Sequence, residues 1–236
     1  MRLLSIIIPV YNEEERIVRT LSTIIGYLEG IMYDFEIIAI DDGSVDNTPK
    51  ILQNFASSYT KIKVLNNTIN LGKGAAVRNG VLNAEGEYIY FTDADLSTPI
   101  EELEKFLSYI KDYDIVIGSR ATKGSQILVH QPFYREFMGK TFNKLVKLFF
   151  RMNFNDTQCG AKLFKKDVAK KIFSISKING FAFDVEVLYI AELYGYKIKE
   201  VPVLWRHSKG SKVHLVKNGL EMLVDLFRIK FNNYLK

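Results

Sequence analysis

The sequence has almost no cysteine and no long apolar run. Its 236 residues include one cysteine, Cys159, so an intramolecular disulfide is excluded and a reducing compartment such as the cytoplasm is expected. We expect Cys159 to be a small buried side chain rather than a reactive thiol. No uninterrupted apolar stretch approaches the ~20 residues that a membrane-spanning helix needs. The segment before Pro9 is too short for a signal peptide and is predicted to be a first buried strand.

Motifs of several well-known enzyme classes are also missing. The three histidines, His130, His207 and His214, do not have the spacing of metal ligands, and the Gly-x-Ser-x-Gly elbow of serine hydrolases is absent. The glycine-rich segment Asn70–Arg78 has neither the spacing of a P-loop nor that of the dinucleotide fingerprint. These absences argue against a nucleophilic serine and against an NAD-dependent oxidoreductase.

The bulk composition is that of an ordinary globular protein. Hydrophobic residues make up 47% of the chain and charged residues 25%, which suits a sizeable core. The length suits one large α/β domain or two small ones. The net charge of +5 is compatible with nucleic acid, anionic lipid or phosphorylated substrates and selects none of them. Because the motifs described below indicate a phosphorylated small molecule, we expect no nucleic-acid partner.

Apolar segments alternate with helical patterns through the first half of the chain. The predicted strands are Leu3–Val10, Phe35–Ile40, Lys61–Leu65, Glu87–Phe91 and Asp114–Gly118, and helices are predicted to begin near Thr48, Gly74 and Pro99. Asn12 and Glu15 have the spacing of a capping box in front of a further helix. Strands that alternate with helices are typical of βαβ units, so we predict an α/β fold with a mostly parallel sheet flanked by helices.

Two acidic clusters each stand at the end of an apolar run. Asp41 and Asp42 follow the second predicted strand, and Asp93 and Asp95 follow the fourth. In an open parallel sheet, ligands bind beyond the carboxyl ends of the strands. Crowded carboxylates repel one another, and a hard cation such as Mg²⁺ both relieves that repulsion and binds substrate phosphates.

The spacing within each cluster refines this prediction. Asp93 and Asp95 are two residues apart, so an extended backbone would direct both side chains to the same side, where we predict a cation that receives a diphosphate. Asp41 and Asp42 are adjacent, so we expect only one of them to line a site. A turn that caps the next helix is the alternative, and it fits the first cluster better than the second.

Basic and aromatic residues near these clusters predict contacts with a phosphorylated ligand. Lys73 lies between two glycines where a helix begins, which favours anion binding, although a tight turn also explains the glycines. Tyr11 follows the first strand, where an aromatic ring can stack on a base. Arg206 and Lys212 belong to a glycine-containing segment that is either a phosphate clamp or a solvated surface loop.

The second half of the chain contains two amphipathic helical patterns. The first carries basic residues at helical spacing, namely Lys140, Lys144, Lys147 and Arg151. The second covers Leu215–Leu235. A basic amphipathic helix either lies on an anionic membrane surface or packs on the sheet with its basic side in solvent, and both possibilities remain open. We therefore divide the chain into a domain of residues 1–212 and a C-terminal helix of residues 213–236.

Taken in order, the motifs resemble those of family 2 glycosyltransferases, which have the GT-A fold. The first half contributes Pro9-Val10-Tyr11-Asn12-Glu13, Asp41-Asp42-Gly43-Ser44, Asn70–Gly74 and Asp93-Ala94-Asp95. The second half is most similar to dolichyl-phosphate β-glucosyltransferases through Gly118-Ser119-Arg120, Asp156–Phe164, Phe183-Asp184-Val185-Glu186 and Glu200–Trp205. Polyprenyl-phosphate mannosyltransferases are similar in outline, so the motifs specify the sugar less well than the family.

This resemblance implies roles for individual positions. The residues implied to bind the nucleotide are Pro9, Tyr11, Asn12, Glu13, Asp42, Lys73, Asp93 and Lys212. Asp93 and Asp95 are implied to hold Mg²⁺ or Mn²⁺ against the diphosphate. Arg120 and Arg135 resemble arginines that meet the acceptor phosphate, and Arg206 resembles part of a loop that closes over phosphates. Asp156 matches a position that orients or deprotonates the acceptor.

The implied reaction is the inverting transfer of a sugar, with glucose expected, from a UDP-sugar to a polyprenyl or dolichyl phosphate. A phosphate monoester has a second pKa of ~6 and is already largely anionic at neutral pH, so Asp156 would mainly position the acceptor. We expect a peripheral enzyme on the cytoplasmic face of a membrane, with the basic helix against lipid headgroups. The alternatives are a GDP-mannose-dependent mannosyltransferase and a non-catalytic nucleotide-sugar-binding protein.

Overall fold

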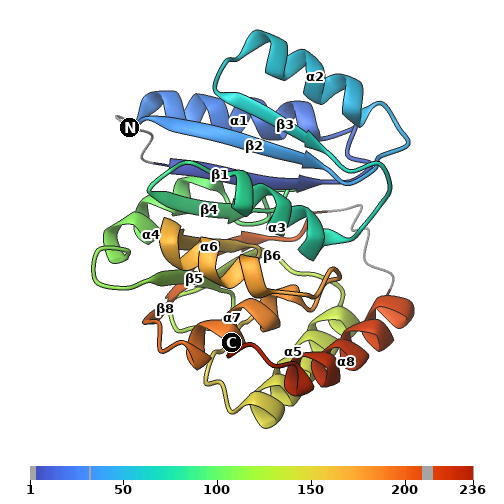
Figure 1. Ribbon diagram of the computed structural model, residues 1–236, viewed down its shortest axis with the longest axis vertical. Coiled ribbons are helices and arrows are strands. Elements are labelled where there is room, and N and C mark those ends of the chain that lie inside the picture. Colours follow the sequence, from blue (N-terminus) through green and yellow to red (C-terminus); the bar gives the residue numbers. More distant parts are fainter. Residues whose placement is uncertain (1–3, 32, 209–214, 236) are drawn as a thin grey trace.

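The computed structural model is a mixed α/β structure and describes residues 4–31, 33–208 and 215–235 (Figure 1). The strands are β1 (Leu4–Val10), β2 (Phe35–Asp41), β3 (Ile62–Asn66), β4 (Tyr88–Thr92), β5 (Ile115–Ser119), β6 (Gln126–Val129), β7 (Ala161–Lys165), β8 (Ile198–Pro202) and β9 (Leu204–Arg206). The helices are α1 (Ile17–Gly30), α2 (Thr48–Ser58), α3 (Lys73–Asn83), a 3₁₀ turn η1 (Ile100–Glu102), α4 (Leu103–Tyr109), α5 (Phe133–Phe150), α6 (Lys166–Ile175), α7 (Phe183–Leu193) and α8 (Leu215–Phe231).

Seven strands form the central sheet in the order β3-β2-β1-β4-β7-β5-β8. Strand β7 runs antiparallel to both of its neighbours, β4 and β5, and the other neighbouring pairs among these described strands are parallel. The predicted α/β fold with a mostly parallel sheet is therefore confirmed. The five strands predicted from the sequence are β1 to β5, and each predicted end lies within one residue of the observed one.

Two hydrophobic cores cover the two faces of the sheet. Helices α1, α2 and α4 bury apolar side chains such as Leu21, Leu52 and Phe106 against one face. Helices α3, α6 and α7 cover the other face, together with the buried ends of α5 and α8. Because the central strands are covered on both sides, β1 and β2 are almost completely buried and mostly apolar.

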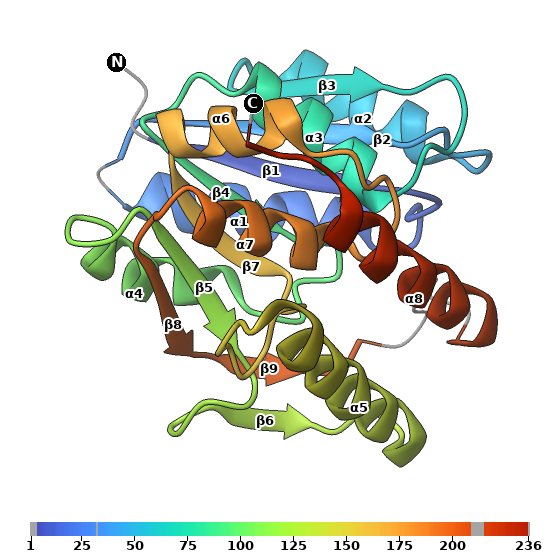
Figure 2. The ribbon, with the colours of Figure 1, turned by 60° about the horizontal axis from the view of Figure 1, so that its bottom comes forward.

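Helices α5 and α8 lie side by side at one end of the molecule, next to the short parallel sheet of β6 and β9 (Figure 2). They contact each other through Phe149 and Phe227, whose ring centroids are 5.1 Å apart in an edge-to-face arrangement. Helix α8 is anchored by Leu226 and Ile229, which are buried in the second core. Among the described helices, none combines the length and the apolar character that a membrane crossing requires.

The predicted capping box was wrong, because α1 begins only at Ile17 and Asn12 lies outside it with a φ of 52°. The Asn12 Oδ1 atom instead accepts a hydrogen bond from the backbone N–H of Val45 at 2.8 Å, so Asn12 connects the loops that follow β1 and β2. On α5, the predicted basic residues Lys140 and Lys144 are exposed, and Lys147 is half-buried and donates to Asn155.

Candidate active site

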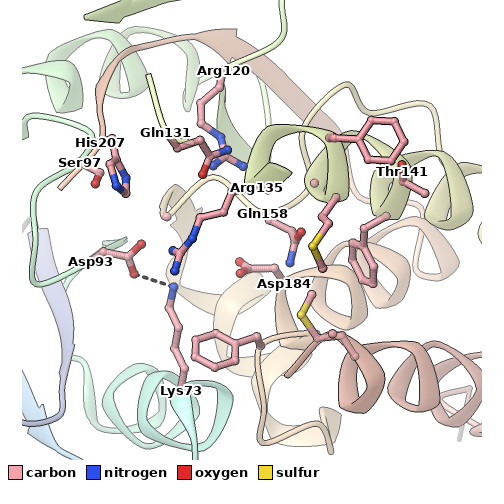
Figure 3. Close-up of a pocket in the computed structure, with 18 of the residues that line it drawn as sticks. Lys73, Asp93, Ser97, Arg120, Gln131, Arg135, Thr141, Gln158, Asp184 and His207 are labelled. Carbon is pink, nitrogen blue, oxygen red and sulfur yellow. Dashed lines mark ion pairs between the residues drawn. The ribbon is translucent and has the colours of Figure 1, made fainter. Parts of the chain in front are cut away.

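A cavity of about 640 Å³ lies beyond the carboxyl ends of β4 and β5, among α3, α5, α7 and α8 (Figure 3). The antiparallel strand β7 starts at the same edge, so residues just before it also face the cavity. Charged residues from five segments converge there, namely Lys73, Asp93, Asp95, Arg120, Arg135 and Asp184. This is the edge at which the sequence predicted a ligand site.

Lys73 and Asp93 form an ion pair inside the cavity, with the lysine Nζ 2.7 Å from the Asp93 Oδ1 atom. Lys73 is the first residue of α3, so its backbone N–H belongs to the helix end that favours anions. Burial alone would lower the pKa of Lys73, but the carboxylates of Asp93, Asp184 and Asp95 outweigh burial and raise it. The lysine is therefore a fixed positive charge.

The two carboxylates after β4 reach the cavity in a way that the sequence did not predict. The segment from Asp93 to Leu96 is a turn, closed by a hydrogen bond from the Leu96 N–H to the Asp93 carbonyl oxygen, so the expected extended backbone was wrong. Both side chains nevertheless line the cavity. Gly160 lies directly against the Asp93 carboxylate, and a Cβ atom at this position would collide with it.

Asp93 and Asp95 suit a hard cation. Burial and the negative charge of Asp93 raise the pKa of Asp95, which is the repulsion that a cation relieves. Among the residues that the structure describes, no cluster of three or more carboxylate, histidine or cysteine side chains could hold a metal ion. Mg²⁺ is commonly bound by one or two carboxylates together with substrate phosphates and water, so the pair fits an ion whose remaining ligands come from a diphosphate.

Asp184 forms the buried wall of the cavity beside this pair (Figure 3). Its Oδ1 atom accepts a hydrogen bond from the Lys162 Nζ at 2.5 Å, and both side chains are at most 4% exposed. Glu186, two residues further along α7, instead accepts hydrogen bonds from the Ile178 N–H and the Tyr234 hydroxyl. Only one of the two acidic residues therefore lines the cavity, in agreement with the helical spacing.

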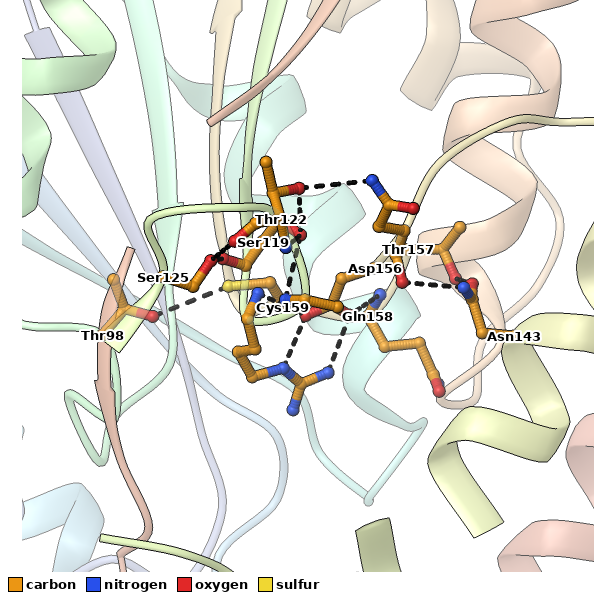
Figure 4. Close-up of polar contacts among 12 residues, drawn as sticks. Thr98, Ser119, Thr122, Ser125, Asn143, Asp156, Thr157, Gln158 and Cys159 are labelled. Atoms are coloured by element: carbon orange, nitrogen blue, oxygen red, sulfur yellow. Dashed lines mark hydrogen bonds and ion pairs between the residues drawn. The ribbon is translucent and has the colours of Figure 1, made fainter. Parts of the chain in front are cut away.

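Arg120 and Asp156 form a two-point ion pair. Figure 4 shows Asp156 among the neighbouring polar side chains, which include Gln158 and Thr157. The guanidinium Nε lies 2.6 Å from one carboxylate oxygen and Nη2 lies 2.8 Å from the other. The backbone N–H of Arg120 also donates to Asp156. Burial would raise the pKa of the Asp156 carboxyl, but Arg120 outweighs burial and lowers it.

This geometry changes what is expected of the two residues. Arg120 lines the cavity and lies over the Trp205 ring at 5.5 Å, whereas Asp156 is buried behind it and is not among the described lining residues. Asp156 therefore fixes the position of the Arg120 side chain. Gln158, whose backbone N–H donates to Asp156, does line the cavity and was missed in the sequence, although it lies inside a quoted motif.

Of the other residues predicted to bind phosphate, one lines the cavity and another is exposed to solvent. Arg135 extends from α5 into the cavity toward Lys73 and Asp93 (Figure 3). Arg206, the last residue of β9, is exposed, whereas Trp205 in β9 and His207 directly after it line the cavity, because alternate residues of an extended backbone face opposite sides. Lys212 lies outside the described residues.

The residues expected to bind the nucleotide base surround the ends of β1 and β2, next to the cavity rather than in it. Asp42 is buried, and its carboxylate accepts hydrogen bonds from the Asn67 side chain and from the N–H groups of Leu71 and Gly72. The backbone N–H of Glu13 donates to the Thr48 hydroxyl at 2.8 Å. Pro9 lies within β1, and Tyr11 is half-buried just beyond it. Their role in binding stays a prediction.

The family model described as glycosyl transferase family 2 matches residues 5–173. The chain belongs to glycosyltransferase family 2. It is 36% identical over 241 residues to the dolichyl-phosphate beta-glucosyltransferase of Mus musculus, covering 96% of this chain and 74% of that protein. It is 33% identical to the protein of the same name from Saccharomyces cerevisiae, again covering 96% and 74%.

Solved structures confirm the GT-A fold of this family 2 member. The glucosyl-3-phosphoglycerate synthase from Mycobacterium tuberculosis, in complex with Mn²⁺, UDP-glucose and phosphoglyceric acid, aligns with a TM-score of 0.71 over 97% of this chain and 80% of that chain, at 16% identity. The TarS fragment from S. aureus aligns with a TM-score of 0.60 over 100% and 67%, at 17% identity. At these identities the alignments show the shared fold alone.

Proposed function

We propose that this glycosyltransferase moves glucose from UDP-glucose to the phosphate of dolichol or a related polyprenol, with inversion at the anomeric carbon. The proposal rests on one observation, which is that carboxylates and cations meet in one part of the cavity while apolar side chains of the amphipathic helices α5 and α8 line another part. The charged end suits a sugar diphosphate and an acceptor phosphate, because charged side chains form strong hydrogen bonds with phosphate oxygens. The name shared by the mouse and yeast relatives supports the same sugar and acceptor.

The donor would extend from the loops after β1 and β2 into the charged end of the cavity. Asp93 and Asp95 would hold Mg²⁺ or Mn²⁺, and Mn²⁺ is present in the structure of the mycobacterial synthase. When bound, such an ion neutralises the charge that grows on the departing diphosphate. Lys73 adds a second, permanent positive charge at the same place, because its ion pair with Asp93 keeps it protonated.

The acceptor phosphate would be held by Arg120 and Arg135, both of which line the cavity. A guanidinium carries five donors, so Arg120 can bind Asp156 through two nitrogens and still donate to a phosphate. An oxygen of this phosphate attacks the anomeric carbon from the side opposite UDP. It is already anionic at neutral pH, so we assign Asp156 to the positioning of Arg120 and not to deprotonation.

We further propose that the enzyme meets its acceptor at a membrane surface. The α5 stripe (Phe133, Phe137 and Leu148) is 82%, 62% and 75% exposed. The α8 stripe consists of Leu220, Val224, Phe227 and Phe231, all more than half exposed. Large exposed apolar patches mark interaction or membrane-contact sites, and the repeated exposure of large apolar side chains on these two helices supports such a site here. Exposed Lys140 and Lys144 lie along the α5 stripe, which suits anionic headgroups.

Transfer to a lipid can be tested directly. The protein is incubated with radiolabelled UDP-glucose, Mg²⁺ and either dolichyl or undecaprenyl phosphate, and the mixture is extracted with organic solvent. We expect label in the organic phase, lost when EDTA is added and absent when labelled GDP-mannose replaces UDP-glucose. Label that stays in the aqueous phase with both lipids would overturn the proposed acceptor, and transfer from GDP-mannose alone would overturn the donor.

A further inference from the structure

The helix that carries Lys73 is capped by a distant part of the chain. Gly72 precedes Lys73 at the start of α3 and has no side chain that could accept a hydrogen bond from the first turn. The carbonyl oxygen of Asn179 accepts these hydrogen bonds instead, from the backbone N–H of Gly74 at 2.7 Å and from that of Ala75 at 3.2 Å. The start of α3, and Lys73 with it, is therefore held by a segment from the second half of the chain.

We call residues 176–180, between α6 and α7, the support loop. The loop lies very close to α3. A Cβ atom at Gly72 would be 2.5 Å from the Asn179 carbonyl oxygen, and a Cβ atom at Gly74 would be 2.5 Å from the carbonyl oxygen of Ile178. The two glycines therefore permit the close approach of the support loop, and a displaced loop would no longer fit against the start of α3.

A buried carboxylate holds the support loop in turn. Glu186 of α7 is 0% exposed and accepts hydrogen bonds from the backbone N–H groups of Lys177 at 2.8 Å and Ile178 at 2.9 Å. The third donor is the Tyr234 hydroxyl, 2.7 Å from the Glu186 Oε1 atom. Because a carboxylate that has left water depends on such donors, each of the three contributes to its placement.

Tyr234 belongs to the segment that follows α8. It is 3% exposed, and its ring packs edge-to-face on Tyr189 of α7 with centroids 6.3 Å apart. Its backbone carbonyl oxygen accepts a hydrogen bond from the Tyr194 hydroxyl at 2.8 Å. A continuous series of contacts therefore runs from the end of α8 through Glu186 and the support loop to Lys73.

We propose that Tyr234 and Glu186 are positioning residues that set the Lys73 ammonium group for the diphosphate of the donor. This inference rests on the proposed function, which assigns Lys73 to the diphosphate. Neither positioning residue is among the described lining residues of the cavity, so both act through other groups.

The physical reason is the flexibility of the lysine side chain. An ammonium group on a four-carbon stem is a point charge, and its position depends on where the backbone below it is held. The Asp93 carboxylate fixes the far end of the Lys73 side chain, and the support loop fixes its backbone. Because a misplacement of about 1 Å can cost roughly 100-fold in rate, the second constraint matters for function.

The test measures binding of a nucleoside diphosphate, without any transfer reaction. Isothermal titration calorimetry with UDP and Mn²⁺ gives the dissociation constant of UDP. The informative change is Tyr234→Phe, because it removes one oxygen atom from Glu186 and keeps the ring that packs on Tyr189. We expect UDP to bind this variant about fivefold more weakly, which is part of the contribution of one hydrogen bond to a charged group.

A second variant changes the carboxylate itself. Glu186→Gln replaces one acceptor oxygen by an amide that faces a backbone N–H, and we expect it to weaken UDP binding at least as much. The matched control is Tyr194→Phe, which removes a hydroxyl that holds the same C-terminal segment without touching Glu186. UDP affinity of this control should stay within about twofold of wild type. Urea midpoints of all variants are measured to compare their stability.

A double-variant cycle tests whether the effect passes through Lys73. In the Lys73→Gln background, Tyr234→Phe should change UDP affinity by less than about twofold, because the side chain that it positions is gone. A purely structural effect would weaken UDP binding by the same factor in both backgrounds.

The outcomes separate this inference from the proposed function when glucose transfer to the lipid is measured in parallel. A loss of UDP affinity in Tyr234→Phe that disappears in the Lys73→Gln background supports the positioning role, whether or not label reaches the lipid. Equal UDP affinity of wild type and Tyr234→Phe, the same loss in both backgrounds, or an equal loss in Tyr194→Phe would overturn it and leave the proposed function intact. Absence of UDP binding to the wild-type protein would overturn both.

Discussion

The polar end and the apolar end of the cavity are built in different ways. At the polar end, charges are fixed by other charges, as in the Lys73–Asp93 and Lys162–Asp184 pairs. At the apolar end, the helices α5 and α8 leave much of their apolar surface exposed. Directed hydrogen bonds to a sugar diphosphate need preset geometry. A hydrocarbon chain is stabilised by the burial of apolar area, and this effect does not depend on direction. The geometry of the second end can therefore be less precise.

The comparison predicts that single substitutions at the polar end greatly reduce activity or stability, and that single substitutions at the apolar end have smaller effects. At the polar end a substitution leaves a buried partner without its counter-charge. At the apolar end it removes area from a surface that is already in water in the free protein. The predictions below run from the largest expected effect to the smallest.

The largest effect is expected for Asp95→Asn. Loss of this carboxylate weakens the cation site and the stabilisation of the leaving diphosphate, and we expect kcat to fall by about 10³. The measurement is steady-state transfer at saturating Mn²⁺ and UDP-glucose. Asp112→Asn is the matched control, because Asp112 is exposed in the turn before β5. A decrease of less than tenfold in Asp95→Asn would remove this residue from the metal site.

The next effect is expected for Asp156→Asn. The Arg120 guanidinium loses its two-point partner in a partly buried place, which should lower the free energy of unfolding by about 3 kcal/mol. Urea titration at pH 7 measures it. The control is Asp34→Asn, which breaks the solvent-exposed pair with Lys61 and should leave the urea midpoint almost unchanged.

The same pair predicts a pH dependence with a definite sign. The pKa of Asp156 is lowered on folding, so its stabilising contribution is present above the unfolded pKa of ~3.9 and is lost as the pH falls through the lower, folded pKa. The difference in unfolding free energy between wild type and Asp156→Asn should be constant from pH 5 to 8 and shrink below about pH 4. A difference that grows on acidification would contradict the pairing.

Kinetics distinguish a positioning role of Asp156 from a role as base. If Asp156 only positions Arg120, then Asp156→Asn and Arg120→Lys should lower kcat/KM for the acceptor by similar factors, and the double variant should be no worse than the worse single one. A base would instead give additive losses and a pH-dependent kcat in the Arg120→Lys background.

At the apolar end, Phe133→Gln and Phe231→Gln should each weaken binding to vesicles by roughly tenfold, because each removes an exposed aromatic ring from the proposed membrane contact. Their unfolding free energies should stay within about 0.5 kcal/mol of wild type. Co-sedimentation with vesicles that contain anionic lipid measures the binding. Val18→Gln on α1 is the control, with an exposed apolar side chain outside both stripes.

The smallest effect is expected for Lys140→Gln and Lys144→Gln. A lysine near an anionic surface contributes about 1 kcal/mol, so each change should weaken vesicle binding by roughly fivefold at low salt and have no effect at high salt. Binding that is independent of anionic lipid would contradict an electrostatic contribution from α5.

Much of the fold and part of the site could be predicted from the sequence. Strands β1 to β5 were found because fully buried parallel strands are short apolar runs between turn residues, and the acidic clusters mark their ends. The antiparallel strand β7 was not predicted, since its pairing with β4 depends on contacts between distant segments. The capping box failed for a related reason, because Asn12 is engaged by Val45 rather than by the helix that follows it.

The site, too, was predictable from the sequence only in part. The motifs identified Lys73, Asp93 and Arg120 as cavity residues, but they did not show that Asp156 lies behind Arg120 or that Arg206 faces outward. Spacing in the chain reports which side chains can share a face of one element. It contains no information about which carboxylate meets which guanidinium across two elements, because that distance is set by packing.

By itself, the sequence determined the family 2 glycosyltransferase fold, the edge of the sheet at which charge gathers and the residue types available there, because these follow from local periodicity and short motifs. Only the tertiary structure decided that Asp156 is the partner of Arg120, that Asp184 rather than Glu186 lines the cavity, and that α5 and α8 enclose an apolar end. Each of these depends on how elements far apart in the chain pack together, and packing is a property of the whole folded molecule.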